Sequence, residues 1–173
     1  MPDHMSVVLL TGTVATGKTR IAAEIAEILP PERSIACVDL DQLGWGFLPG
    51  VSADRILRLR IDNLAAIWPN LRSAGFRHVV ISGAVSTPEE LRLIREAIEP
   101  SDLTVVRLKT SPSLLESRLA SRDGGRLFDA HLAIMPVLER SLDGANMQDV
   151  SVMNDARPAR RVAMEVLEKV GWT

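Results

Sequence analysis

The stretch GTVATGKT, from Gly12 to Thr19, fits the pattern G-x-x-x-x-G-K-[ST] at every fixed position. This is the Walker A pattern, a loop whose successive backbone N–H groups wrap the phosphates of a nucleotide. In such a loop the lysine, here Lys18, reaches the outer phosphates, and the hydroxyl of Thr19 is a ligand of Mg²⁺. We therefore expect every residue of the loop to contact the nucleotide: Gly12, Thr13, Val14, Ala15, Thr16, Gly17, Lys18 and Thr19.

The residues on both sides of this loop support the same interpretation. The run SVVLL, from Ser6 to Leu10, is short, apolar and β-branched, which is typical of a buried strand. After the loop, apolar residues recur at helical spacing from Ile21 to Leu29, and Pro30 ends the segment. The motif requires this order of strand, loop and helix, because the N-terminus of the helix adds the positive end of its dipole to the anion site.

Composition and charge exclude several classes of protein. The 173 residues, 46% of them hydrophobic, suffice for one domain with a sizeable core. A net charge of −2 gives no basic footprint for general nucleic-acid binding. Cys37 is the single cysteine, and we expect it to be a small core residue in a buried strand. No apolar run approaches the roughly 18 residues of a membrane span, and no signal peptide is visible, so we expect a cytoplasmic protein.

Predicted strands and helices alternate along the chain, which favours an α/β fold with a parallel sheet. The expected strands cover residues 6–10, 34–39, 79–81, 103–108 and 150–153. A helix with a kink at Pro69 is expected after the second strand, and one that begins at Thr87, with Thr87 as its N-cap, after the third. Ser111 opens a further helix that gives way near Arg122, and Pro136 interrupts the helical region after it.

Polar residues follow the second and third predicted strands, and open parallel sheets bind their ligands at the carboxyl ends of strands. Phosphoryl transfer needs a carboxylate that orients the metal ion or accepts the proton of the attacking hydroxyl, and Asp39 is well placed for it. Asp41 is two residues further on, and in an extended segment its side chain would point the same way as that of Asp39, where it could contact the substrate. The alternative is that Asp41 is a turn residue. Ser82 stands where ATPases usually carry an acid, which weakens an ATPase-motor interpretation. It either contacts metal-bound water at the acceptor site or satisfies the end of the strand.

Arg118, Arg122 and Arg126 recur every four residues around the pair Gly124-Gly125. The glycines indicate a helix that gives way to a mobile loop. Guanidinium groups on such a loop can fold over a nucleotide and stabilise the phosphoryl group during transfer, and we expect Arg122 to act in catalysis. The alternative is a solvated charged face.

The segment GWGFLPG, from Gly44 to Gly50, contains Trp45 and Phe47, two of the six aromatic residues of the chain. Because it follows Asp41 closely, we expect these rings to form an apolar wall for the phosphate acceptor, or to pack the loop down. Arg55 lies just beyond and is a candidate for binding an anionic acceptor, with surface solvation as the alternative.

With these residues the chain resembles the small P-loop kinases of the nucleoside-monophosphate kinase type. Within that group it is most similar to the chloramphenicol phosphotransferase-like and related small-molecule kinases. The likeness covers nearly the whole chain in order. It rests on the Walker A loop, on Val38-Asp39, on the segment from Glu116 to Arg126, which is similar to an arginine-bearing lid, and on the segment from Asp149 to Asp155.

The resemblance implies a three-layer αβα P-loop NTPase fold, with a five-stranded parallel sheet in the order 2-3-1-4-5. It implies a single kinase-like domain over residues 1–173, with a lid at roughly residues 118–130. It also implies ATP and Mg²⁺ as cofactors, and transfer of the γ-phosphate to a hydroxyl of a small molecule. Asp39 would act as general base or hold the metal ion with Thr19, Lys18 would stabilise the transferred group, and Asp155 would border the adenine base.

Two other functions stay open. The missing acid at Ser82 favours a nucleotide-binding regulatory or interaction module with little turnover. Arg55 permits a kinase that acts on a nucleotide, a sugar-nucleotide or a nucleic-acid end, although the acidic balance gives no support for a polynucleotide. The sequence leaves open the identity of the acceptor, the choice between ATP and GTP, and the oligomeric state.

Overall fold

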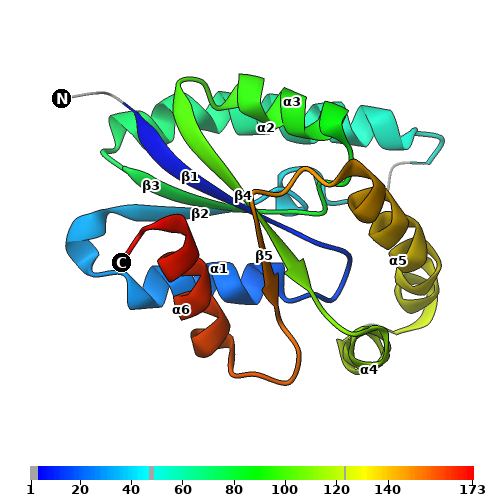
Figure 1. Cartoon of the computed structure of the whole chain (residues 1–173). Helices are drawn as coiled ribbons and strands as arrows, with labels where there is room; N and C mark the ends of the chain where they lie inside the picture. Colours follow the sequence, from blue (N-terminus) through cyan, green and yellow to red (C-terminus); the bar gives the residue numbers. More distant parts are fainter. Residues whose placement is uncertain (1–3, 47–48, 123) are drawn as a thin grey trace.

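The computed structural model describes residues 4–46, 49–122 and 124–173, with the side chain of Arg126 left out. Its centre is a parallel sheet (Figure 1) of β1 (Met5–Thr11), β2 (Ile35–Asp39), β3 (His78–Ser82), β4 (Ser101–Lys109) and β5 (Val150–Met153). Within these ranges the strand order is β2-β3-β1-β4-β5, and every neighbouring pair is parallel. The α/β fold and the predicted strand order are therefore confirmed.

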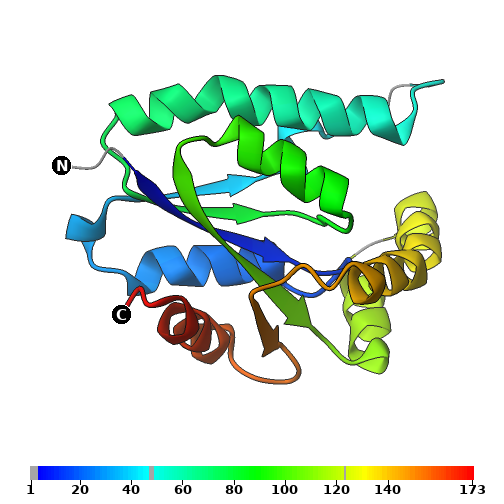
Figure 2. The ribbon, with the colours of Figure 1, turned by 45° about the horizontal axis from the view of Figure 1, so that its top comes forward.

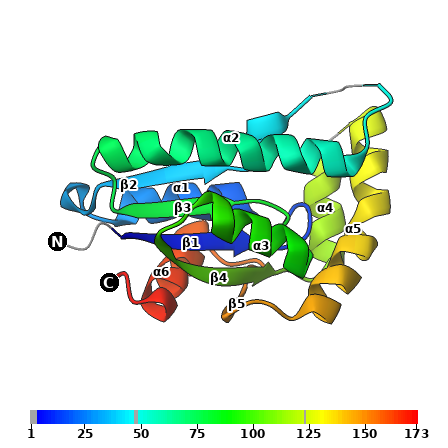
Figure 3. The ribbon, with the colours of Figure 1, turned by 90° about the horizontal axis from the view of Figure 1, so that it is seen from above.

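Helices cover both faces of the sheet and one of its ends. α1 (Lys18–Ile28) and α6 (Ala159–Val170) pack on one face, and α2 (Ala53–Ser73) and α3 (Pro88–Ala97) pack on the other (Figures 1 and 3). α4 (Pro112–Arg122) and α5 (Gly125–Ala145) lie near the carboxyl ends of the strands (Figure 2). Short 3₁₀ helices, η1 (Pro31–Arg33) and η2 (Gln42–Gly44), flank β2. No helix in the described ranges is long and apolar enough to span a membrane.

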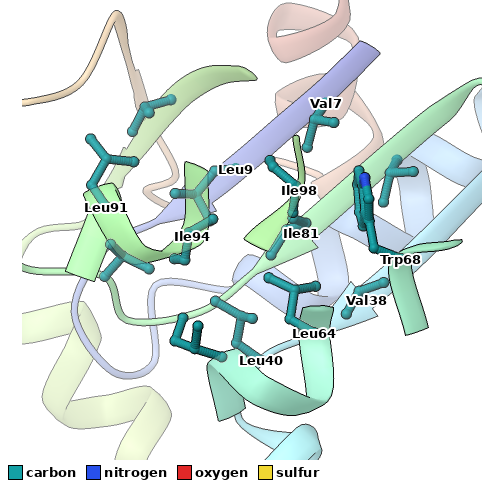
Figure 4. Close-up of a cluster of buried hydrophobic side chains, with 14 of the residues drawn as sticks. Val7, Leu9, Val38, Leu40, Leu64, Trp68, Ile81, Leu91, Ile94 and Ile98 are labelled. Carbon is teal, nitrogen blue, oxygen red and sulfur yellow. The ribbon is translucent and has the colours of Figure 1, made fainter. Parts of the chain in front are cut away.

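The alternation of side chains along the strands divides the core between the two faces. On β1, Val7 belongs to the core under α2 and α3, whereas its neighbour Val8 belongs to the core over α1 and α6. Figure 4 shows the first of these cores, with Leu64 and Trp68 of α2 and Ile94 of α3 packed over the strands. Burying one large apolar side chain contributes about 1.5–3 kcal/mol. The two cores therefore fix the sheet, and with it the loops at its carboxyl end.

Local signals set the start of α3 as the sequence predicts. The Thr87 hydroxyl accepts a hydrogen bond from the backbone N–H of Glu90, and the Glu90 carboxylate accepts one from the backbone N–H of Thr87. This reciprocal pair is a capping box, which satisfies two N–H groups that a helix start leaves without partners.

The expected interruption at Pro136 is wrong, because α5 is continuous from Gly125 to Ala145. Pro136 is exposed, while Met135 and Leu142 are buried on the inner side of the helix. A proline on the solvent side removes one hydrogen bond but leaves the packed side in place, so tertiary packing keeps the helix intact. α2 likewise continues past Pro69 to Ser73, and the kink expected there stays a prediction.

The expectation that Cys37 is a core residue is also wrong, because its side chain is exposed. Cys37 lies on β2, which is the edge strand of the sheet next to β3. An edge strand is covered less completely than the central strands, which leaves Cys37 accessible to solvent. The Cys37 thiol lies 3.5 Å from the Ala22 carbonyl oxygen.

Candidate active site

The predicted phosphate loop joins the end of β1 to the start of α1, and its glycines hold conformations that other residues rarely adopt. Gly12 has φ 148° and Gly17 has φ 88°, and Ala15 between them is also left-handed at φ 62°. A Cβ at Gly12 would lie 2.5 Å from the Leu108 carbonyl oxygen, and one at Gly17 would lie 2.6 Å from the Asn154 amide nitrogen. The alternating backbone turns successive N–H groups toward one point, which is the geometry of an anion-binding nest.

Buried hydrogen bonds fix the loop from several directions. The Thr16 hydroxyl donates to the Thr13 carbonyl, and the Thr13 hydroxyl donates to the Met135 carbonyl of α5 at 3.2 Å. The Asn154 amide, just beyond β5, donates to the Thr16 carbonyl at 2.7 Å. The loop is therefore shaped before any ligand binds, which lowers the entropic cost of binding.

Lys18 is buried inside the loop, where its ammonium donates to the Gly12 and Thr13 carbonyls at 3.0 and 2.9 Å. Burial lowers the pKa of Lys18 from 10.5 to about 8, against the opposing effect of the Asp41 and Asp39 carboxylates. A cation held in this way by carbonyl dipoles is stabilised further when a phosphate approaches, because a nearby opposite charge favours the charged form.

Asp39, at the end of β2, lies beside the first turn of α1. One of its carboxylate oxygens accepts a hydrogen bond from the Thr19 hydroxyl at 2.7 Å, and the other accepts one from the Asp41 backbone N–H at 3.0 Å. A hydroxyl and a carboxylate are hard oxygen ligands of the kind that Mg²⁺ takes, usually together with waters and substrate phosphates. No cluster of three or more acidic, histidine or cysteine side chains suited to a metal occurs among the described residues. The residues present thus fit a magnesium ion shared with a nucleotide.

A cleft of about 850 Å³ opens above these groups. Its wall contains most of the predicted site residues: Val14, Ala15, Gly17, Lys18, Thr19, Asp39, Asp41, Trp45, Arg118 and Arg122. These residues come from the loop after β1, from α1, β2 and α4, and from the loop after β2, and the fold brings them to one place. The cleft therefore combines an anion cradle with two carboxylates and the guanidinium groups of two predicted arginines.

The predicted arginines have different surroundings. Arg118 is half-buried and donates to the carbonyls of Ala15 and Asn154, at 3.4 and 2.9 Å. Arg122 is exposed, and one of its terminal nitrogens lies 3.3 Å from a ring nitrogen of His131 in α5. The backbone of Arg126 belongs to α5, and its side chain lies outside the described part of the structure. Arg118 thus connects the phosphate loop to the segment after β5, and Arg122 faces the cleft.

Several other predicted residues do not line the cleft. Ser82 is buried at the end of β3, opposite Asp39 in the pairing of the two strands. Arg55 is exposed in the first turn of α2. The Asp155 carboxylate accepts a hydrogen bond from the Ser111 backbone N–H at 2.7 Å, so it caps the start of α4. Phe47 lies outside the described residues.

The cleft also contains residues that the sequence patterns did not single out, above all Arg60 of α2 and His131 of α5. Arg60 is three residues before Asn63, whose amide donates to the Leu43 carbonyl of η2. The helical spacing of α2 could have indicated Arg60. It lies four residues before the buried Leu64, and residues four apart share one side of a helix. No such signal marked His131, whose position follows from the packing of α5.

A second hollow, of about 940 Å³, lies between the end of α1 and α6. Its wall combines apolar side chains such as Met164 and Trp172 with an ion pair between Arg157 and Glu165 at 2.7 Å. None of its described wall residues is a predicted site residue. The candidate active site is therefore the cleft at the phosphate loop.

Comparison with known proteins identifies the fold of the chain. The sequence matches no family model and no curated protein. Among solved structures, the tunicamycin resistance protein of Deinococcus radiodurans has a TM-score of 0.67 at 17% identity, with 98% of each chain covered. The chain has the P-loop kinase fold.

Two kinases with this fold are similar over nearly their whole lengths. A gluconokinase from Sinorhizobium meliloti 1021 has a TM-score of 0.62 at 22% identity, with 96% of this chain and 92% of the gluconokinase covered. A shikimate kinase from Aquifex aeolicus vf5 has a TM-score of 0.62 at 16% identity, with 96% of each chain covered. At such identities the likeness concerns the fold alone.

Proposed function

We propose that the protein is an ATP-dependent phosphotransferase that moves the γ-phosphate of ATP to a hydroxyl of a small molecule, with Mg²⁺. One observation carries the proposal: the buried ammonium of Lys18, at the start of α1, and the Asp39 carboxylate, at the end of β2, line the same cleft. Phosphoryl transfer depends on this combination of charge neutralisation and a correctly placed carboxylate.

Each residue has a role that its contacts support. Bound MgATP would supply the phosphoryl group. The acceptor oxygen would form a bond to the γ-phosphorus while the bond from that phosphorus to the bridging oxygen of ADP breaks, and ADP would leave. Asp39 accepts the proton of the acceptor hydroxyl, or orients the metal ion together with Thr19. Lys18 and Arg122 offset negative charge on the group in transfer, and Arg118 braces the loop at the Ala15 carbonyl.

The acceptor that we propose is a small, neutral or weakly polar hydroxyl compound, in line with the resemblance to chloramphenicol phosphotransferase-like kinases. The D. radiodurans neighbour is a tunicamycin resistance protein by name, which agrees with an antibiotic or a similar compound as acceptor. The roles of Asp155 at the base and of residues 118–130 as a lid remain parts of this proposal.

A nucleotide-binding module with little turnover is the second candidate. The observation in its favour is that Ser82 is buried and absent from the cleft wall, so the end of β3 contributes no carboxylate to the cleft. Asp39 separates the two candidates, because a kinase needs its carboxylate and a passive module does not.

Substitution of Asp39 tests the choice directly. We expect Asp39→Asn to bind ATP within a few-fold of the wild type and to lose about 10²–10⁴-fold in transfer rate, the usual contribution of a positioned acid or base. The measurement is ADP release against a panel of antibiotics, nucleosides and sugars, with nucleotide binding followed by thermal shift. Asp62→Asn, at an exposed position of α2, is the matched control.

Lys18→Ala provides a second, independent test. It should weaken ATP binding or turnover, because it removes the cation inside the phosphate loop. Indifference to Lys18→Ala would remove the basis for nucleotide binding here. Unchanged transfer in Asp39→Asn would instead contradict the catalytic role that we propose for Asp39.

A further inference from the structure

One end of the cleft is not used by the phosphate loop. Its wall consists of Asp41, Gln42 and Trp45 after β2, together with Arg60 of α2 and Ala84 after β3. If the proposed function holds, this end receives the acceptor, since the Asp39 carboxylate contacts both the Thr19 hydroxyl and the Asp41 backbone N–H. The chemistry of this wall then determines which acceptors fit.

The side chains of Asp41 and Arg60 form an ion pair at 3.0 Å. The pair is held in place, because a Cβ at Gly44 would lie 2.9 Å from the Arg60 Cγ, so the arginine stem packs closely against η2. Asn63, one turn further along α2, binds the Leu43 carbonyl of the same 3₁₀ helix. The arginine is thus fixed in the wall rather than free to swing.

The described wall residues of the cleft include more cations than carboxylates. Of the described wall residues, those around the phosphate loop and α4 supply most of the cations: Lys18, Arg20, Arg118 and Arg122. At the other end, the positive charge of Arg60 is matched by the negative charge of Asp41. To bind Arg60, an anionic acceptor would have to displace the Asp41 carboxylate from it. The acceptor would then lie beside that carboxylate and close to the phosphates of ATP, and both would repel it.

Hydrogen-bonding groups nevertheless remain at this end. The Asp41 side chain is 44% exposed, and its carboxylate can accept a hydrogen bond from a hydroxyl, whereas the terminal nitrogens of Arg60 can donate one. The Arg60 Nε is buried and has no hydrogen-bond partner among the described residues, so Asp41 alone does not satisfy the guanidinium. Gln42 adds an amide with both a donor and an acceptor.

Trp45 supplies an apolar surface in the same wall. Its side chain is 64% exposed, the largest exposed fraction among the large hydrophobic side chains of the described chain. An indole face beside polar groups suits a ring whose flat side is apolar and whose edge carries hydroxyls.

We propose that the acceptor is an uncharged, ring-bearing hydroxyl compound, and that the Asp41–Arg60 pair and Trp45 select it against anionic acceptors. The proposal rests on the function proposed above. It adds a ring to the neutral acceptor proposed there and names Arg60, which no sequence pattern singled out, as a specificity-determining residue.

Matched acceptors that differ in charge test the selection. Phenyl glucoside and uridine are the uncharged members, with phenyl glucuronide and uridine monophosphate as their anionic counterparts, in ADP-release assays with MgATP. We expect kcat/KM to be at least about tenfold higher for an uncharged member than for its anionic counterpart. Trp45→Ala should raise KM for the ring compounds more than it raises KM for sorbitol, an open-chain polyol.

Variants of the ion pair give a sharper readout. Asp41→Asn leaves Arg60 unmatched, so the preference for the uncharged member should fall at least about tenfold. Arg60→Ala should raise KM about tenfold with a smaller change in kcat, and Arg60→Lys should restore part of the loss. Arg55→Ala, an exposed arginine on the same helix outside the cleft, should match the wild type.

Three outcomes would overturn the inference: faster turnover of an anionic member, no turnover of either uncharged member, or an unchanged charge preference in Asp41→Asn. Failure of the underlying function looks different. In that case ATP itself would give no thermal stabilisation, and no acceptor of any charge would release ADP.

Discussion

At the scale of single residues, the site depends on charges held away from water. Lys18 is 9% exposed and is satisfied by two loop carbonyls, while the Asp39 carboxylate uses both of its oxygens to hold the Thr19 hydroxyl and the Asp41 backbone. Burying an ammonium costs free energy unless an opposite charge arrives. The ligand-free loop therefore stores a cost that a bound polyphosphate offsets.

This cost predicts a specific pH dependence of stability. Because burial lowers the pKa of Lys18 from 10.5 to about 8, the unfolded chain binds more protons than the native protein between these values. The free energy of unfolding should therefore rise with pH in this window, by about 3 kcal/mol from this group, at about 1.4 kcal/mol per pH unit. Below pH 8 Lys18 is charged in both the native and the unfolded protein, so folding pays the full free-energy cost of burying its ammonium.

Urea unfolding of the wild type and of Lys18→Met, at pH 8 and pH 10.5, measures this effect. The wild type should gain about 3 kcal/mol relative to the variant between the two pH values. Other groups that titrate in this range, such as Cys37, occur in both proteins and cancel in the difference. Parallel stabilities of the two proteins across the window would contradict the pKa of Lys18.

At the scale of elements, the position of α5 depends on polar contacts with three other parts of the fold. Arg107 of β4 is buried and forms ion pairs with Glu139 and Asp143 of α5 at 2.7 and 2.8 Å. The Ser141 hydroxyl donates to the Ser86 carbonyl at 2.9 Å, and the Thr13 hydroxyl reaches α5 from the phosphate loop. These contacts place His131 at the cleft.

The ion pairs of Arg107 should respond asymmetrically to substitution. Glu139→Gln with Asp143→Asn leaves a buried cation unmatched, and we expect a loss of about 3 kcal/mol in the free energy of unfolding. Arg107→Met leaves two partly exposed carboxylates, which water can solvate, and should cost about 1 kcal/mol. Urea unfolding measures both.

The matched control for this pair of variants is Glu96→Gln, which removes an exposed ion-pair partner of Arg92 on α3 and should leave the free energy of unfolding nearly unchanged. A larger loss in Arg107→Met than in the double variant would mean that packing of the arginine stem, and not its charge, positions α5.

At the scale of the whole molecule, the strand order brings together chain segments that are far apart in sequence. The loop after β1, the end of β2, the segment after β5 and the start of α5 all meet at the cleft. The two ends of the chain are also joined, because the Trp172 indole donates to the Ser6 hydroxyl at 3.0 Å and packs edge-on against His78. A ligand in the cleft would therefore contact residues that are far apart in the sequence.

Nucleotide binding should stabilise the entire molecule. At about 100 times its Kd, MgATP should add about 2.7 kcal/mol to the free energy of unfolding. For a chain of this size that corresponds to a rise in Tm of about 5–10 °C. Differential scanning fluorimetry measures the shift, with Lys18→Ala as the variant in which it should shrink. A Tm that MgATP leaves unchanged would contradict nucleotide binding.

The sequence by itself determined the fold class, the phosphate loop and the place of Asp39. Short-range patterns suffice for these features: the glycine positions enforce the loop, and the ends of parallel strands meet at one edge whatever the details of packing. The same patterns failed for Pro136 and Cys37, because continuity of α5 and exposure of β2 depend on what neighbouring elements cover.

Only the tertiary structure decided which side chains share the cleft. Arg55 and Arg60 are five residues apart on one helix, yet only Arg60 lines the cleft wall beside Asp41. Asn154 and His131 join the site from segments more than a hundred residues after the phosphate loop. The reason is physical: a pattern along the chain reports which face a side chain occupies, whereas its partners depend on how distant elements pack against that face.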